Sequence, residues 1–295
     1  MLLPNLEAGI FADSWRIRHS SVKLLGDLLF HLSGVTGKMS ATGGEDENFG
    51  TNEGFKAIAK TLGQARRDKV LAGLYICRAD VALEVRQNSM HIWKIVVPNT
   101  PRLLREILPV LLSALINNLA SKNSDKRKTA AKTLGDVVRK LGERTLPDLI
   151  PILERNLSTA DPSHRQGVCI GLSEIIKACS RDAISSFTDS LVPAIRRALC
   201  DELCDVREAA ARTFENLHDT IGITAIEGVL PPMLKKLADC DDTEEQELVV
   251  DGLKQIIAVK GRHVLPQIVP KLIEEPVNTE MLALLSSVAG ESLNR

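Results

Sequence analysis

Aromatic side chains are scarce in this chain of 295 residues, in which Phe, Trp and Tyr make up 3% while hydrophobic residues as a whole make up 44%. The core must therefore be packed mainly by aliphatic side chains. This composition is typical of packed helices and disfavours an aromatic-rich β-sandwich or barrel. The sequence predicts an all-α protein with enough chain to bury a sizeable core.

Long apolar runs, a secretory start and a large charge excess are also missing. No run reaches the ~18 apolar residues of a membrane-spanning helix, and Pro4 and Glu7 interrupt the opening stretch where a signal peptide would be apolar. The net charge of −1 disfavours a surface built throughout for nucleic acid. Six scattered cysteines without an entry signal indicate reduced thiols. We expect a cytoplasmic protein without a membrane partner.

What the chain does contain is a proline that recurs at nearly constant spacing. It occurs in LLPNLEAGI at Pro4, ILPVLLSAL at Pro109, LIPILERNL at Pro151, LVPAIRRAL at Pro193, VLPPMLKKL at Pro231 and IVPKLIEEP at Pro270. From the second of these stretches onward the intervals are 42, 42, 38 and 39 residues. The flanking apolar positions form one stripe on a 3.6-residue helix. Because proline lacks the N–H and crowds the carbonyl four residues back, we expect each one to bend its helix.

A second register accompanies the prolines. A mostly basic position opens another amphipathic run in each unit, at Arg18, Arg86, Arg127, Arg165, Arg207 and Gln246. Apolar residues follow seven and ten positions later in every case. Two registers with one period near forty residues indicate helix–turn–helix units. Since a single unit cannot bury its own apolar stripe, we predict an α-solenoid of about seven stacked units.

The predicted organisation has three parts. Residues 1–33 form a first unit, residues 34–53 form a flexible loop with five glycines, and residues 54–295 form a continuous solenoid of about six units. The second of the repeated helix–turn–helix units lacks the proline. The chain opens on the apolar residues Leu2, Leu3, Leu6, Ile10 and Phe11. This start predicts a piece of a longer solenoid with an exposed apolar end.

The sequence contains no recognisable catalytic or metal-binding motif. Cys200 and Cys204 are four residues apart, but no second Cys/His pair lies at the spacing that a zinc site requires. The six histidines are dispersed, and neither an HExxH nor a GxSxG pattern is present. We therefore predict that the chain is not an enzyme and has no metal, cofactor or small-molecule substrate.

The arginines that open the second helices have two interpretations. They could line up as a cationic stripe for a partner, or each could bind a turn aspartate of its own or the next unit. The planar guanidinium favours the second, because it pairs bidentately with carboxylates. The predicted ladder consists of Arg18, Arg86, Arg127, Arg165 and Arg207 with Asp80, Asp125, Asp161, Asp201 and Asp205.

Clusters of basic residues on predicted polar helix faces are the candidate partner contacts. They are Arg66, Arg67 and Lys69; Lys122, Lys126, Lys128 and Lys132; Arg139, Lys140 and Arg144; Arg196 and Arg197; and Lys235 and Lys236. Most such runs are simply solvated faces. Several clusters on one ridge would, however, suit a nucleic-acid or acidic protein partner despite the nearly neutral total charge.

The kinked first helix, the aspartate-bearing turn and the Val-Arg opening of the second helix resemble HEAT repeats. The stretches DVREAA (205–210) and ALEVRQ (82–87) match that pattern best. Longer stretches, among them WRIRHSSVKLLGDLLFHLSG and SDKRKTAAKTLGDVVRKLGERTLPDLIPIL, are similar to the family of the general control non-derepressible translational activator. The middle region of that family is related to the HEAT part of fungal translation elongation factor 3.

This resemblance implies a non-catalytic scaffold that is cytoplasmic and polysome-associated. The family binds ribosomes and activates the protein kinase that phosphorylates the α subunit of initiation factor 2 during amino-acid starvation. A separate family segment binds the RWD domain of that kinase, so the resemblance implies the kinase only as an indirect partner. No motif here matches a kinase-binding residue, and we assign none. The basic clusters are the expected ribosome contacts.

Two other functions are compatible with a HEAT-like fold. One is an adaptor of another system, either a phosphatase scaffold or a nuclear transport receptor, and a transport receptor would require an acidic inner lining. The other is a HEAT-like nucleic-acid enzyme, which would require a strongly cationic groove with exposed aromatic side chains. Trp15 and Trp93 instead occupy apolar positions of the predicted helices.

Overall fold

The computed structural model describes residues 2–34, 50–240, 242–272 and 286. These residues form α-helices, one short 3-10 helix and the connecting turns, without any strand in the described ranges, and the predicted all-α solenoid class is confirmed. The chain divides into two compact units, Met1–Thr145 and Leu146–Arg295. Continuity of the solenoid from one unit to the other remains a prediction.

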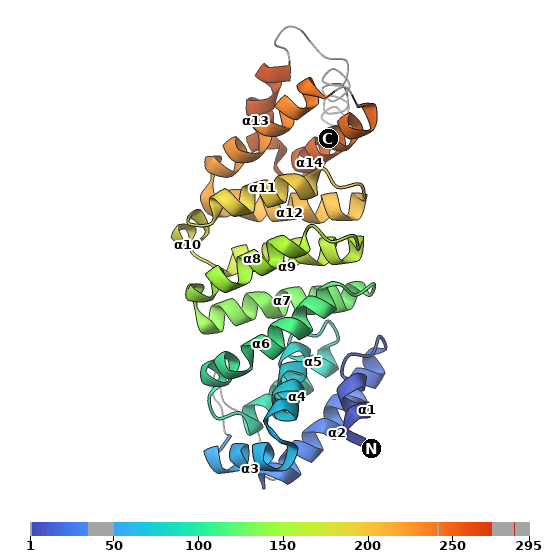
Figure 1. Cartoon of the computed structure of the whole chain (residues 1–295), viewed down its shortest axis with the longest axis vertical. Coiled ribbons are helices and arrows are strands. Elements are labelled where there is room, and N and C mark those ends of the chain that lie inside the picture. The colour runs from blue at the N-terminus through green and yellow to red at the C-terminus, as the bar shows by residue number, and fades with distance from the viewer. Residues whose placement is uncertain (1, 35–49, 241, 273–285, 287–295) are drawn as a thin grey trace. The chain divides into compact units, whose positions relative to one another are not determined.

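The described part of the first unit contains three helix pairs and one additional helix, coloured blue to green in Figure 1. The pairs are α1 (Leu2–Gly9) with α2 (Trp15–Ser33), α4 (Gln64–Cys77) with α5 (Leu83–Val96), and α6 (Thr100–Leu119) with α7 (Ser124–Leu141). The additional helix is α3 (Asn52–Leu62), and η1 (Glu143–Thr145) ends the unit. Helix α4 packs on α6, and α2 packs on α5. Neighbouring pairs therefore bury one another's apolar stripes.

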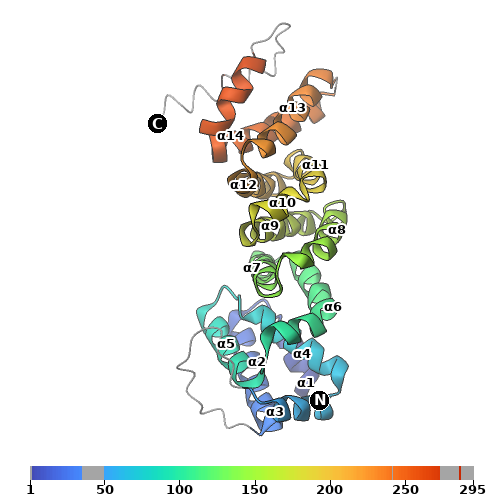
Figure 2. The same ribbon diagram turned by 90° about the vertical axis from the view of Figure 1, so that its left-hand side faces the viewer.

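The second unit repeats the same arrangement in two layers (Figure 2). The first helices are α8 (Leu146–Asn156), α11 (Thr188–Leu199) and α13 (Ile223–Asp239), and the second helices are α9 (Pro162–Ala178), α12 (Cys204–Ile221) and α14 (Thr243–Leu272). Helix α11 contacts both α8 and α13, while α12 contacts both α9 and α14. A short helix, α10 (Arg181–Ser185), joins the first pair to the second.

The aliphatic stripes form the core of each unit. In α6, for example, Leu104, Ile107, Leu111 and Leu115 have no exposed side-chain surface, and their spacing places them on one helix face. The apolar residues at the start of the chain were expected to be exposed. This is wrong for Leu6 and Ile10, which are 4% and 2% exposed because α1 packs against α2 and α4.

In most helix–turn–helix repeats the recurring proline lies inside the first helix, as predicted. Prolines lie within α6, α8, α11 and α13, at Pro109, Pro151, Pro193 and Pro231. Pro4 differs because it lies in the first turn of α1, where an N–H has no helical acceptor and its loss forces no bend. Pro270 lies in α14, whose helical dihedrals break earlier, at Lys260 with φ −134° and ψ 30°.

The predicted loop at 34–53 lies mostly outside the described residues. Gly34 ends α2 with φ 70°, a left-handed conformation that favours glycine. Helix α3 begins at Asn52, inside the stretch that the sequence assigned to the loop, because the Thr51 hydroxyl caps it by accepting a hydrogen bond from the Gly54 N–H at 3.1 Å.

Candidate partner-binding surfaces

Arg18 on α2 joins the first helix pair to the second. Its Nε donates to Asp80 Oδ2 at 2.7 Å and its Nη2 donates to Asp80 Oδ1 at 2.8 Å, in a bidentate pair that is almost wholly buried. Its Nη1 donates to the carbonyls of Ala12 and Asp13 in its own turn. Asp80 also accepts from the Ala82 N–H that opens α5. The side-chain hydrogen bonds to Asp80 raise the pKa of Arg18 above its usual value.

The same geometry recurs in the second unit. Arg165 on α9 forms a bidentate pair with Asp201, with Nε–Oδ2 at 2.6 Å and Nη2–Oδ1 at 2.9 Å. Arg207 on α12 donates from Nη1 to the Asp201 carbonyl at 2.6 Å, and it pairs with Asp251 of α14. The arginines therefore connect three consecutive helix pairs. Their charge is used inside the fold, so they form no stripe for a partner.

Among the described residues, two ladder arginines make hydrogen bonds only within their own turns. Arg86 donates from Nη1 to the Asp80 carbonyl at 2.6 Å, and Arg127 donates from Nη1 to the carbonyls of Ser121 and Lys122 at 2.7 and 2.9 Å. The buried Nε of Arg127 has no hydrogen-bond partner among the described residues. Arg127 is only 8% exposed, so it is not available as a surface contact.

Three predicted ladder aspartates do not bind a ladder arginine in the described structure: Asp125, Asp161 and Asp205. Asp80 and Asp201 precede the ladder arginine of their own turn by six residues. The other three aspartates precede it by only two or four residues. Asp161, for example, caps α9 by accepting from the Ser163 N–H at 2.9 Å.

Asp251 is a ladder partner that the sequence reasoning missed. The position six residues before Gln246 is Cys240 instead of an aspartate, and Arg207 therefore reaches an acidic residue inside α14. Gln246 keeps the contact within its own turn by donating from Nε2 to the Cys240 carbonyl at 2.5 Å. The sequence did contain a signal: the turn ADCDD (238–242) has Cys240 at the position where the turns before Arg86 and Arg207 have an aspartate.

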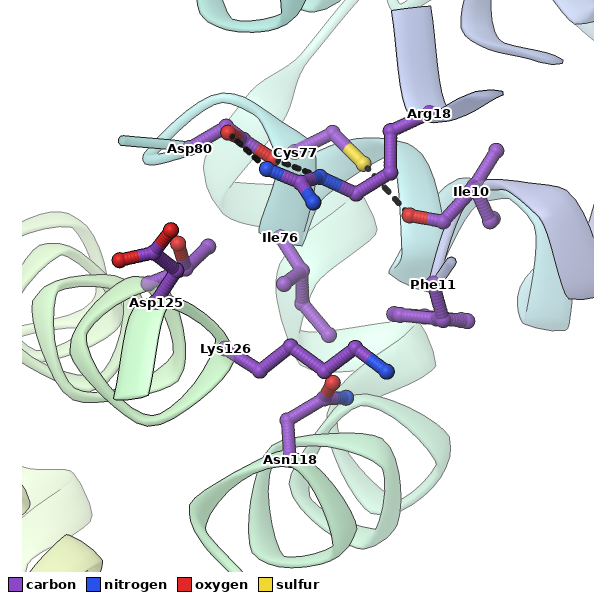
Figure 3. A pocket seen from close by; sticks show the side chains of 10 residues that line it. Ile10, Phe11, Arg18, Ile76, Cys77, Asp80, Asn118, Asp125 and Lys126 are labelled. Atoms are coloured by element: carbon purple, nitrogen blue, oxygen red, sulfur yellow. Dashed lines mark hydrogen bonds and ion pairs between the residues drawn. The ribbon is translucent and has the colours of Figure 1, made fainter. Parts of the chain in front are cut away.

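A small hollow lies beside the Arg18–Asp80 pair (Figure 3). Its volume is roughly 20 Å³, and Figure 3 shows Arg18 bound to Asp80 and the Cys77 thiol directed at the Ile10 carbonyl, 3.6 Å away. This space is sufficient for about one water molecule. Burial raises the pKa of the Cys77 thiol to about 12, so this cysteine is not a reactive nucleophile.

The first predicted basic cluster separates into three different environments. Arg67 was predicted to contact a partner, but it is only 6% exposed and pairs with Asp68 and Glu106. Its guanidinium also lies 5.1 Å from the ring centroid of Phe55. Arg66 is exposed and pairs with a carboxylate of α1, whereas Lys69 is exposed and has no ion-pair partner among the described residues. Only Lys69 is a free cation of this cluster.

The second cluster forms an exposed face of α7. Lys128 and Lys132 are exposed and have no ion pair within the described part of the chain, and Lys122 is exposed in the preceding turn. Lys126 is half-buried and pairs with Asp13 at 2.7 Å. Because residues four apart lie on the same face of a helix, Lys128 and Lys132 present their charges together.

The third cluster continues α7 toward its end. Arg139 is exposed, lies eleven residues after Lys128 and therefore projects from nearly the same helix face. It is 3.9 Å from Asp136, which also accepts a hydrogen bond from the Tyr75 hydroxyl. Lys140 is half-buried, and Arg144 in η1 is exposed. Arg139 extends the Lys128 face, whereas Arg144 follows after the helix has ended.

A basic hollow lies between α11 and α13 in the second unit. Its volume is roughly 330 Å³, and its lining includes Arg196, Arg197 and Lys236 without any carboxylate. Arg197 is exposed and makes no described ion pair, and neither does the nearby Lys235. Lys236 forms an ion pair with Glu245, with Nζ and Oε1 2.5 Å apart. This hollow therefore brings three cations around one space.

No catalytic or metal-binding arrangement forms among the described residues. No group of three or more His, Cys, Asp and Glu side chains in these ranges is placed to hold a metal ion. Cys200 and Cys204 make no such site, and burial raises the pKa of the Cys200 thiol. None of the helices in the described ranges combines the length and apolarity needed to cross a membrane.

The linings of the described hollows bear on the alternative functions. The hollow beside Trp15 combines three carboxylates with Arg18, while the hollow between α11 and α13 carries only cations. This mixed charge disfavours the uniformly acidic lining that a nuclear transport receptor would need. Trp15 was placed at an apolar position, but it is 37% exposed, whereas Trp93 is buried as expected.

Comparison with known proteins gives a full-length match of this chain to part of much longer proteins. Residues 91–256 match the family described as "Stalled ribosome sensor GCN1-like, HEAT repeats". The chain is 62% identical to human "Stalled ribosome sensor GCN1" over 100% of its length and 41% identical to Saccharomyces cerevisiae "eIF-2-alpha kinase activator GCN1" over 99%. It spans 11% of each of these two relatives. "Elongation factor 3" of Eremothecium gossypii is 22% identical over 76% of the chain and 21% of that protein.

Proposed function

The chain belongs to the GCN1 family of HEAT-repeat proteins, and from this premise we propose that it is a non-catalytic scaffold that helps to hold a GCN1-type protein on the ribosome. The relatives that match it over its whole length are called a stalled ribosome sensor and an activator of the eIF-2-alpha kinase. The arginines of the ladder hold the helix pairs together, which leaves other cations free for a partner. The expected location is cytoplasmic and polysome-associated.

The exposed face of α7 carries this proposal in the first unit. Lys128, Lys132 and Arg139 project from nearly one direction, and the two lysines have no internal ion pair in the described structure. Free lysines in such a row suit the phosphates of ribosomal RNA, because each contact releases condensed counterions. Phosphate contacts also position a protein without reading a base sequence, as a scaffold on a ribosome requires.

The basic hollow of the second unit offers a second phosphate contact. Arg196, Arg197 and Lys236 surround a space of roughly 330 Å³ that is open to a phosphate group. A guanidinium can bind a phosphate through two parallel hydrogen bonds. The eIF-2-alpha kinase enters the proposal only as an indirect partner, reached through the remainder of the longer protein.

Co-sedimentation of the 295-residue chain with purified ribosomes tests the proposal. We expect binding that weakens as salt rises, and a further loss of about tenfold in affinity in the double variant Lys128→Glu, Lys132→Glu, since two phosphate contacts become repulsive. The matched control is Lys23→Glu, Lys60→Glu, which changes the same charge on exposed lysines of α2 and α3. Salt-insensitive binding, or equal loss in both double variants, would refute a role for the α7 face.

A further inference from the structure

A hollow of roughly 690 Å³ lies between α4 and α6 in the first unit, and its lining does not include Lys128, Lys132 or Arg139. Its lining includes Phe11, Lys69, Pro109, Ser113, Asn117 and Lys126. The volume falls in the range of about 300–1,000 Å³ that is usual for ligand-binding pockets. The hollow therefore has room for several side chains of another molecule.

Apolar side chains supply much of the wall surface of the hollow. Phe11, Pro109 and Val110 supply apolar surface, while Ala72 and Ala114 keep the space between the two helices open. Pro109 is the recurring proline of this repeat, and it is exposed here although it lies within α6. An apolar side chain that entered this space would be removed from water, which favours binding.

Two lysines supply the only charges of the lining, which contains no carboxylate. Lys69 is exposed and has no ion pair within the described ranges. Lys126 pairs with Asp13, whose side chain is 76% exposed, and Figure 3 shows the lysine extending between Phe11 and Asn118. Because Asp13 is largely exposed to water, its ion pair with Lys126 is weak, and a ligand carboxylate can replace it.

The remaining polar groups suit a polypeptide backbone. The Asn118 side chain donates from Nδ2 to the Ala114 carbonyl at 2.7 Å, so its amide is held in place. The Asn117 side chain is exposed and makes no hydrogen bond among the described residues. Its amide offers a donor and an acceptor side by side, which is the pattern that a peptide group presents in return.

We propose that this hollow binds an extended segment of a partner protein in which apolar side chains are flanked by Asp or Glu. The apolar walls take the apolar side chains, and Lys69 and Lys126 take the carboxylates. An RNA strand fits less well, because only one aromatic ring and two cations line the space. The inference does not depend on ribosome binding, and it gives Lys69 and Lys126 a role other than phosphate contact.

Selection from a random peptide display library against the whole 295-residue chain tests the proposal. Peptides retained by the wild type are counter-selected against Ser113→Trp, in which the indole occupies the hollow; Ser113 is exposed, so the core of α6 is not disturbed. We expect the recovered peptides to combine apolar residues with Asp or Glu. Fluorescence anisotropy with the consensus peptide then gives affinities for the wild type, Lys69→Glu and Lys128→Glu.

The expected result is a loss of about tenfold in peptide affinity for Lys69→Glu and no change for Lys128→Glu, which lies outside the hollow. Ribosome co-sedimentation should show the opposite order, so failure of one proposal is distinguishable from failure of the other. Circular dichroism confirms that each variant is folded. The proposal is overturned if no peptide is enriched, if the enriched peptides are basic, if Ser113→Trp retains them, or if poly(U) RNA binds the hollow and displaces them.

Discussion

The substitution Asp80→Ala is expected to destabilise the first unit far more than the loss of one surface charge. It removes both hydrogen bonds to the buried Arg18 guanidinium, at 2.7 and 2.8 Å, and the bond to the Ala82 N–H at 2.8 Å. The side chains of Arg18 and Asp80 are 6% and 3% exposed, so water cannot replace the carboxylate without rearrangement. Breaking a buried pair by removing one partner costs about 3–5 kcal/mol.

Urea denaturation followed by circular dichroism, together with calorimetry, measures this loss. For a unit of this size the expected cost corresponds to a fall of about 10 °C in Tm. Asp13→Ala is the matched control, because it removes the same charge from an exposed side chain that pairs with Lys126, and it should destabilise the protein far less than Asp80→Ala. If the two variants lose equal stability, the ladder is not what joins these helix pairs.

Three further predictions concern packing and titration. Gly252→Ala should cost about 1–3 kcal/mol in urea denaturation, because its Cβ would lie 2.2 Å from the Leu199 carbonyl oxygen; a neutral result would mean that α11 and α14 separate easily. Burial and the neighbouring His263 lower the pKa of His218, so the unfolded state binds the proton more tightly. The free energy of unfolding should therefore fall as pH drops below about 6.5. His218→Gln should flatten this pH dependence, and an unchanged slope would show that His218 is not its source. Burial raises the pKa of Cys77 to about 12, so at about pH 8 a thiol reagent should label Cys77 only after denaturant is added.

The repeat architecture could be predicted from the sequence because it depends on local patterns. The forty-residue period and the position of Pro109, Pro151, Pro193 and Pro231 follow from apolar spacing along single helices, and the structure places all four inside first helices. Helix α3 was not predicted as a separate element, since it belongs to no repeat and follows a stretch rich in glycine.

The partners of the ladder could be predicted only in part. Asp80 and Asp201 stand at one fixed distance before the arginine of their own turn, and they bind Arg18 and Arg165 of the preceding helix pair. Arg207 of α12 pairs with Asp251 of α14 because packing of these two helices brings that carboxylate within reach of the guanidinium. Proximity of this kind is a property of packing and has no counterpart in linear spacing.

The sequence by itself determined the helix–turn–helix repeat, the place of the prolines and the lack of a catalytic motif, because each depends on residue types at short range. Tertiary structure decided which cations are available to a partner. Arg67 lies beside Lys69 in a run of charges, yet packing against Asp68, Glu106 and an aromatic ring buries it while Lys69 remains in solvent. Whether a charged side chain is paired inside the fold or exposed at the surface depends on which residues of neighbouring helices pack against it.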